Sequence, residues 1–230
     1  MGVVILGMHR SGTSLLIGLL QEYGYQLGDV SNQTSRFKPT GTKENLAIRR
    51  VNNEILQLNG CSWNHPIENL IINEVIANKM KDISLKKNKW AVKDPRMVLT
   101  YDYWSPYLPK HKLIATIRSP LEVARSLKLK NGLPLKEGIE VWFIYNKILL
   151  NHWQKYKFPI LNFNLNKQDY YQQFQNLSDY LGIECISEKF NRFYQHTTPA
   201  QDIDKEKLGS SIVGLHNKLL KISMNSYYDS

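Results

Sequence analysis

Short apolar runs alternate along the chain with longer segments in which apolar residues recur every three or four positions. The runs are Val3–Leu6, Trp90–Val92, Lys112–Ile117 and Phe158–Phe163. Their length and composition predict buried strands. The segments with helical spacing are Thr13–Glu22, Lys43–Leu58, Ile67–Leu85, Pro120–Leu129, Leu135–Tyr156 and Gln168–Leu181. Strands that alternate with helices are typical of an α/β fold with a parallel sheet.

Prolines and a glycine mark where several of these elements begin or end. Pro95 lacks a backbone donor and disfavours helical angles at Asp94, so the second strand must end there. Ser119 is the expected N-cap of the next helix, with Pro120 as its first residue, and Gly182 closes the last predicted helix. Ligands of parallel α/β sheets bind at the carboxyl ends of strands. The segments that follow the first three strands are therefore where we expect a site.

The first of these segments is G-M-H-R-S-G, residues 7–12, which has the glycine spacing of a phosphate-binding loop between a strand and a helix. Such a loop turns backbone N–H groups toward one anion, and the positive end of the following helix adds its field. Thr13 and Ser14 follow the second glycine, where a nucleoside triphosphatase would carry lysine. The loop therefore predicts an anion site that is compatible with a nucleotide. It matches less well the site that holds the γ-phosphate of a nucleoside triphosphate.

Two further polar segments follow predicted strands. The segment R-S-P begins at Arg118, and Ser126 lies eight residues after that arginine. A helical rise of about 1.5 Å per residue places Ser126 only about 9 Å beyond the proline. One phosphate could then contact both the planar guanidinium and the serine hydroxyl. The other segment, K-D-P-R, begins at Lys93.

In this order, the motifs resemble those of sulfotransferases that use 3′-phosphoadenosine 5′-phosphosulfate. Arg10–Ser14 resembles their 5′-phosphosulfate loop, although lysine is more common in the family at the position of Arg10. Arg118 and Ser126 resemble the R-x-P segment and later serine that bind the 3′-phosphate, and K-D-P-R resembles a segment of bacterial members. The resemblance covers Val3–Ser126 and implies a P-loop-containing three-layer α/β/α domain with a central parallel sheet.

The resemblance also implies a reaction and the residues that serve it. A sulfuryl group would pass from the nucleotide to a hydroxyl or amine acceptor, leaving adenosine 3′,5′-bisphosphate, without a metal. A carbohydrate or other glycan is the acceptor that the resemblance favours. The implied cofactor-binding residues are His9, Arg10, Ser11, Gly12, Thr13, Ser14, Arg118 and Ser126. Because the reaction demands cationic support for the sulfuryl oxygens, Arg10 and Lys93 are the expected catalytic cations.

An acceptor hydroxyl also requires a base. Glu44 lies in G-T-K-E, which resembles a G-x-x-E element that opens the second helix of related bacterial sequences and faces the cofactor pocket. The same glutamate would also be favourable in a first helical turn simply because of the helix dipole. Asp94 is a second candidate, unless it pairs with Arg96 and shapes the strand end. His9 and His65 are further candidates, and the sequence leaves the choice open.

Later parts of the chain match the family pattern less well. The resemblance extends loosely past the fourth strand, where Phe163 and Asn164 stand in place of a frequent Tyr-Glu pair. His196 and the tail Gln201–Ser230 are expected to cover the nucleotide as a lid. Tryptophans among helices are more often core residues than sugar-stacking ones, so we expect Trp63, Trp104, Trp142 and Trp153 in the core.

Composition narrows the class of protein. With 230 residues, the chain is expected to form one domain over residues 1–230. Thirty Lys and Arg against 20 Asp and Glu give a net charge of +10, which favours an anionic partner. The two cysteines lack metal or redox spacing, which favours a reducing compartment, and neither a leader nor a membrane span is apparent. We therefore expect a cytoplasmic protein; peripheral membrane contact and oligomeric state stay open.

Two other functions are alternatives. A small-molecule kinase with a phosphate loop would need magnesium and a lysine near the β- and γ-phosphates, whereas Thr13 stands after the second glycine. A non-enzymatic nucleic-acid binder would use the net charge, with its cations clustered on one face. Here cations lie at the ends of three predicted strands, so a nucleotide is expected as the partner and nucleic acid is not.

Overall fold

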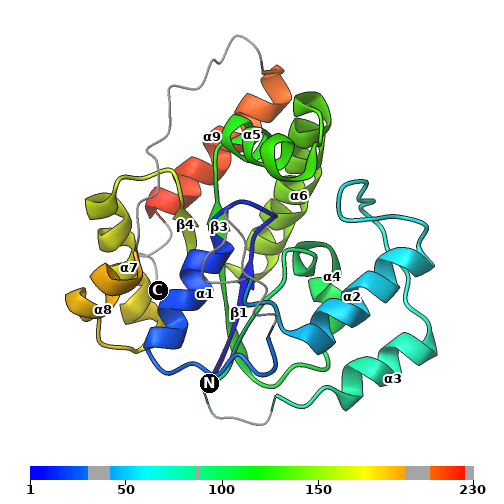
Figure 1. Ribbon diagram of the computed structural model, residues 1–230, viewed down its shortest axis with the longest axis horizontal. Helices are drawn as coiled ribbons and strands as arrows, with labels where there is room; N and C mark the ends of the chain where they lie inside the picture. Colours follow the sequence, from blue (N-terminus) through cyan, green and yellow to red (C-terminus); the bar gives the residue numbers. More distant parts are fainter. Residues whose placement is uncertain (31–41, 86–88, 195–207, 226–230) are drawn as a thin grey trace.

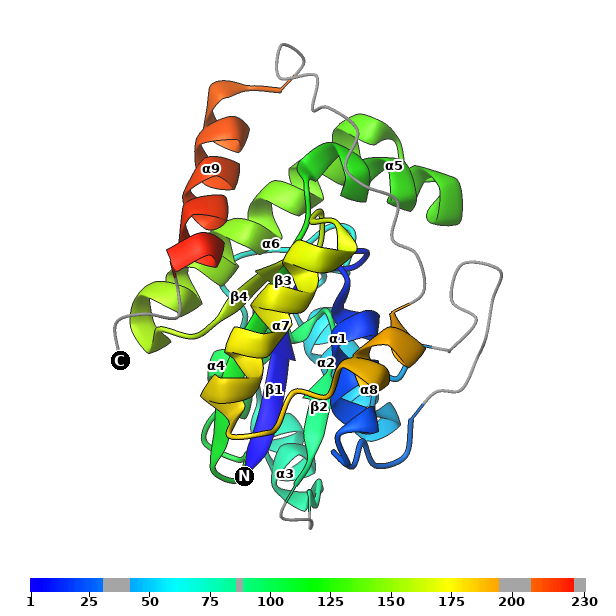
Figure 2. The same ribbon diagram turned by 90° about the vertical axis from the view of Figure 1, so that its left-hand side faces the viewer.

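The computed structural model describes residues 1–30, 42–85, 89–194 and 208–225. In this part of the chain, parallel strands form one sheet between two layers of helices (Figures 1 and 2). The strands are β1 (Gly2–Leu6), β2 (Ala91–Lys93), β3 (His111–Ile117) and β4 (Ile160–Asn162), in the order β2-β1-β3-β4. Every pairing between them is parallel. The predicted α/β class with a central parallel sheet is confirmed.

Helices cover both faces of this sheet. They are α1 (Thr13–Glu22), α2 (Leu46–Leu58), α3 (Glu74–Asp82), α4 (Met97–Trp104), α5 (Pro120–Asn131), α6 (Leu135–Tyr156), α7 (Lys167–Leu181), α8 (Ser187–Phe193) and α9 (Ser210–Asn225). On one face, Val3 and Ile5 of β1 pack with α1, α7 and α8. On the other, Val4 and Leu6 pack with α2, α4 and α6. Burial on both faces explains why β1 is a continuous apolar run instead of an alternating one.

Two predicted helices begin later than their apolar spacing suggested. α2 begins after Asn45, whose side chain accepts a hydrogen bond from the Ile48 N–H at 3.2 Å. α3 begins after Asn73, whose side chain accepts from the Ile76 N–H at 3.0 Å. The helix predicted from residue 67 is therefore wrong for residues 67–73. In both places an asparagine side chain satisfies an early helical N–H group, and this capping sets the boundary.

Within the described ranges, α4, α8 and α9 were not predicted. α9 lies in the tail that we expected to act as a lid, but its Leu215 and Leu219 are buried in the core, and it packs against α6 and β4. For this part of the tail the lid expectation is wrong. His196 and residues 201–207 lie outside the described residues. Trp104 and Trp142 are fully buried, as predicted.

A buried histidine on α6 makes the fold sensitive to acid. His152 Nε2 lies 2.9 Å from the Val98 carbonyl oxygen, and burial lowers its pKa although that carbonyl and Asp102 oppose the change. Burial likewise lowers the pKa of His111. Below the ordinary histidine pKa of about 6.5, the unfolded chain therefore binds more protons than the folded one, so stability must fall as the pH falls.

We expect the free energy of unfolding to fall as the pH is lowered below about 6.5. Urea unfolding of the wild type and of His152→Gln at several pH values measures this effect. The variant should lose part of the slope. An identical slope in both proteins would show that His152 does not contribute.

Candidate active site

The loop between β1 and α1 is a tight turn that is held to the sheet. Ser11 Oγ donates to the Met8 carbonyl at 2.7 Å and lies 3.2 Å from Thr116 Oγ1 on β3. Gly12 has φ 94°, and a Cβ at this position would lie 2.3 Å from a ring carbon of Phe163. Because only glycine combines a positive φ with this close approach, the second glycine of the loop is required by the geometry.

The loop leads into a helix end that is suited to an anion. α1 has no side-chain cap at Gly12, so its first N–H groups face the space beyond the loop. A cavity of about 140 Å³ lies there. Its lining residues are His9, Arg10, Gly12, Thr13, Ser14, Leu15, Pro95, Arg118 and Phe163. Because ligand pockets usually measure about 300–1,000 Å³, this cavity suits a charged group better than a whole nucleotide.

Two arginines from different strand ends meet at this cavity. Arg10 adopts a left-handed backbone conformation, with φ 69°, and its Nε donates to Ser126 Oγ at 2.7 Å. Arg118 Nη1 donates to the Arg10 carbonyl at 3.3 Å, and its Nη2 pairs with Glu122 at 3.1 Å. The residues predicted to bind one phosphate thus lie near one another. In the structure, however, Ser126 contacts Arg10 and so joins the loop to α5.

Charge at these arginines is not fully compensated. Burial lowers the pKa of Arg10, and the neighbouring charge of Arg118 lowers it further. Burial also lowers the pKa of Arg118, although Glu122 opposes this change. Arg118 Nε is buried and has no hydrogen-bond partner among the described residues. A bound anion would stabilise both guanidinium groups and could accept from this Nε.

Side chains from the segment after β4 and from α6 hold the segment around Arg118. Its guanidinium lies over the Phe163 ring, 5.4 Å from the centroid, and Trp142 Nε1 donates to its carbonyl at 2.8 Å. Asn164 Oδ1 accepts from the Ser119 N–H at 2.5 Å. The two residues that depart from the family pattern, Phe163 and Asn164, therefore support this segment. Ser119 precedes α5 as predicted, but its side chain makes no capping hydrogen bond.

Lys93 extends from the end of β2 into the interior. Its ammonium donates to the Thr42 carbonyl at 2.6 Å and to Ser14 Oγ at 3.4 Å, and it forms an ion pair with Glu44 at 3.4 Å. None of its side chain is exposed. Burial lowers the pKa of Lys93, while the charges of Glu44 and Asp94 oppose this change. Lys93 thus connects the first turn of α1 with the segment before α2.

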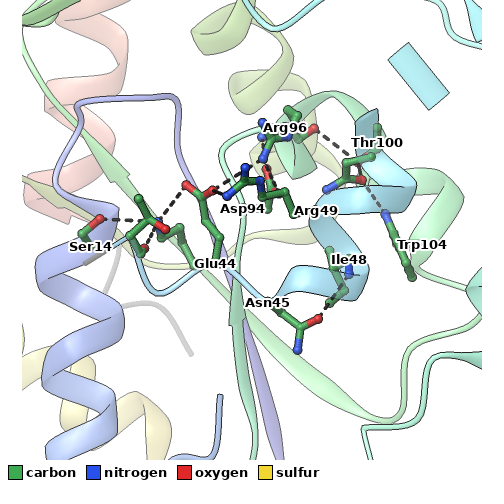
Figure 3. Close-up of polar contacts among 12 residues, drawn as sticks. Ser14, Glu44, Asn45, Ile48, Arg49, Asp94, Arg96, Thr100 and Trp104 are labelled. Atoms are coloured by element: carbon green, nitrogen blue, oxygen red, sulfur yellow. Dashed lines mark hydrogen bonds and ion pairs between the residues drawn. The ribbon is translucent and has the colours of Figure 1, made fainter. Parts of the chain in front are cut away.

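The two candidate carboxylates have different surroundings (Figure 3). Asp94 is fully buried; one oxygen accepts from the Arg96 N–H and the other pairs with Arg96 Nη2, both at 2.8 Å. The predicted pairing of Asp94 with Arg96 is confirmed. Glu44 lies 3.4 Å from Lys93, 3.6 Å from Arg96 and 3.9 Å from Arg49. Asp94 therefore shapes the strand end, whereas Glu44 lies at the centre of a cationic cluster.

The histidine candidates separate in space. The His9 ring lies 4.6 Å from the Trp63 ring and 6.3 Å from the Tyr145 ring, measured between centroids, and His9 lines the cavity at the loop. His65 lines a different cavity, beside the start of α6. Only His9 is therefore brought to the anion site. Trp63 lies beside His9, where it is partly buried and packs against the core.

Within the described ranges, no group of three or more His, Cys, Asp and Glu side chains could hold a metal ion. None of the helices described is long and apolar enough to cross a bilayer.

No protein-family model matches this chain, and no curated protein matches its sequence. Its fold is similar to those of several solved structures, including two sulfotransferase domains. The sulfotransferase domain from the curacin biosynthetic pathway has 15% identity and a TM-score of 0.54, over 95% of this chain and 96% of that one. The sulfotransferase domain from the Synechococcus PCC 7002 olefin synthase has 16% identity and a TM-score of 0.51, over 100% and 96%. At this identity the likeness shows the fold alone.

Proposed function

We propose that this protein is a sulfotransferase that moves a sulfuryl group from 3′-phosphoadenosine 5′-phosphosulfate to a hydroxyl or amine acceptor, with a glycan as the favoured acceptor. The observation that carries the proposal is the meeting of Arg10 and Arg118 at the uncapped end of α1. Two undercompensated guanidinium groups and a helix N-terminus fit a ligand with more than one anionic group. The fold of the two sulfotransferase domains supports the same assignment.

The residues present fit this donor. The first N–H groups of α1, with Arg10 and Ser14, would hold the 5′-phosphosulfate. Arg118, whose Nε lacks a partner among the described residues, would hold the 3′-phosphate, and Ser126 would orient Arg10 beside it. When bound, the nucleotide supplies the sulfuryl group and a phosphate leaving group.

The chemical roles follow from the charges around Glu44. Lys93 and Arg10 stabilise negative charge on the oxygens at the reacting centre. We assign the base to Glu44, which would take the proton of the acceptor hydroxyl on a carboxylate oxygen. Asp94 makes a poorer base because it is fully buried and Arg96 engages both of its oxygens at 2.8 Å, whereas the cations around Glu44 lie 3.4–3.9 Å away. Its role is to fix the strand end that carries Lys93.

Binding of adenosine 3′,5′-bisphosphate to Arg118→Gln tests the donor assignment. Charge-assisted hydrogen bonds contribute about 1.5–3 kcal/mol, so we expect the variant to bind the bisphosphate about 10 to 100 times more weakly than the wild type. Calorimetric titration measures this affinity. Arg125→Gln is the matched control, because Arg125 pairs with the same Glu122 but its side chain is 47% exposed. It should bind like the wild type.

The same titration separates the alternatives. The wild type should bind AMP at least about tenfold more weakly than the bisphosphate, because AMP lacks the 3′-phosphate. Equal affinity for the two nucleotides would contradict the role of Arg118. Tighter binding of ATP with magnesium than of the bisphosphate would favour a kinase. Strongly salt-dependent binding of an arbitrary oligonucleotide would favour a nucleic-acid binder.

A further inference from the structure

A further basic residue, Lys130, is brought toward the site by α5. Ser126 lies four residues before it, and residues four apart share one face of a helix. Because Ser126 Oγ accepts from Arg10 Nε at 2.7 Å, this face of α5 is turned toward the loop after β1. Figures 1 and 2 show α5 beside that loop. Lys130 therefore lies on the same face of α5 as Ser126, one turn further along the helix.

The environment of Lys130 differs from that of its neighbours on the helix. Lys130 is half-buried, whereas Lys128 and Leu129 are exposed. Burial lowers the pKa of Lys130, the charge of Arg10 lowers it further, and Glu44 acts in the opposite direction. The ammonium group thus lies within electrostatic reach of both the phosphate loop and the candidate base.

Lys130 has no hydrogen bond or ion pair with another residue in the part of the chain that the structure describes. By contrast, Lys93 is engaged by Glu44 and by a backbone carbonyl, and Arg118 by Glu122. Removing an ammonium group partly from water without a partner costs free energy, and an oxyanion beside it would offset that cost.

We propose that Lys130, on the face of α5 that carries Ser126 toward Arg10, binds an oxyanion other than the two phosphates of the donor; this inference rests on the proposed function. This oxyanion could belong either to the sulfuryl group of the donor or to an acidic group on the acceptor. The second source would make the acceptor an anionic compound, such as a glycan that carries uronate groups. Lys130 would then contribute to the choice of substrate.

The test compares Lys130→Met, Lys130→Arg and the exposed control Lys128→Met by calorimetric titration. The first pair of probes is adenosine 3′,5′-bisphosphate and 3′-phosphoadenosine 5′-phosphosulfate, which differ only in the sulfuryl group. The second pair, added to protein saturated with the bisphosphate, is a uronate-bearing oligosaccharide and a neutral dextran oligosaccharide of the same length. Thermal unfolding of each variant checks that it is folded.

We expect Lys130→Met to bind either the phosphosulfate or the uronate oligosaccharide at least about tenfold more weakly than Lys128→Met, with unchanged binding of the bisphosphate. Lys130→Arg should recover most of the loss. The probe that is affected identifies the source of the oxyanion. The proposal is overturned if Lys130→Met and Lys128→Met bind every probe alike, or if the bisphosphate itself binds more weakly to Lys130→Met. Failure of the wild type to bind the bisphosphate would instead reject the proposed function.

Discussion

Replacing Lys93 by methionine is expected to lower turnover by about 10²–10³-fold, the usual effect of removing one preorganised donor from a developing anion. The fully buried ammonium lies between Ser14 of α1 and Glu44, so methionine would keep much of the volume but remove the charge from the reacting centre. Single-turnover measurement of sulfuryl transfer gives the rate directly. Lys147→Met is the control, because Lys147 forms an exposed ion pair with Glu68 far from this cluster in sequence.

The same substitution has a cost in stability that must be measured separately. Glu44 would lose Lys93 but keep Arg96 at 3.6 Å and Arg49 at 3.9 Å. Breaking a buried ion pair costs about 3–5 kcal/mol when no partner is left, so a loss of less than about 3 kcal/mol in the free energy of unfolding is expected here. A folded Lys93→Met protein with wild-type turnover would contradict the catalytic role of Lys93.

Glu44→Gln is expected to lower turnover by about 10²–10⁴-fold, the range that general base catalysis contributes. Affinity for adenosine 3′,5′-bisphosphate should change little, because the cations in ion pairs with Glu44, which are Lys93, Arg96 and Arg49, are not those assigned to the two phosphates. The measurement is kcat and KM for the donor, beside the affinity for the bisphosphate. Glu54→Gln, which alters an ion pair between Glu54 of α2 and Lys79 of α3, should behave like the wild type.

A second outcome would assign Glu44 a different role. If Glu44→Gln weakened donor binding and left turnover intact, the carboxylate would serve only to hold Lys93 in place. The proton acceptor would then have to be sought elsewhere, with His9 as the histidine that lies at the cavity.

The strands and the longer helices could be predicted because their patterns come from burial. β1 is apolar throughout since both faces of the sheet are covered, and α6 buries one largely apolar face between Gly138 and His152. α4 gave no such stripe because nearly all of its residues are buried. The late starts of α2 and α3 depend on single asparagine caps, which a periodicity argument does not weigh.

The placement of Arg10, Lys93 and Arg118 at one edge of the sheet could also be predicted in outline, because the carboxyl ends of neighbouring parallel strands share that edge. The contacts between individual side chains could not be predicted. The contact of Ser126 with Arg10 depends on the rotation of α5, and the contact of Lys93 with a carbonyl oxygen at Thr42 involves no side-chain signal. Tertiary packing decides both.

Three supporting residues were missed for related reasons. Phe163 follows the fourth strand directly, so its place at the strand end was available as a signal, but an apolar side chain was not expected under a guanidinium. Trp142 was assigned to the core, where it lies, yet its indole N–H also holds the Arg118 carbonyl. Lys130, to which we propose a role, is one of many lysines in the sequence; its half-burial and its place on the Ser126 face of α5 distinguish it, and both depend on the fold.

The most direct test is a crystal structure with adenosine 3′,5′-bisphosphate bound. The account predicts one phosphate against the first N–H groups of α1, beside Arg10, and the other within hydrogen-bond distance of the Arg118 guanidinium. A nucleotide bound elsewhere, or one whose two phosphates both lie away from these arginines, would contradict it.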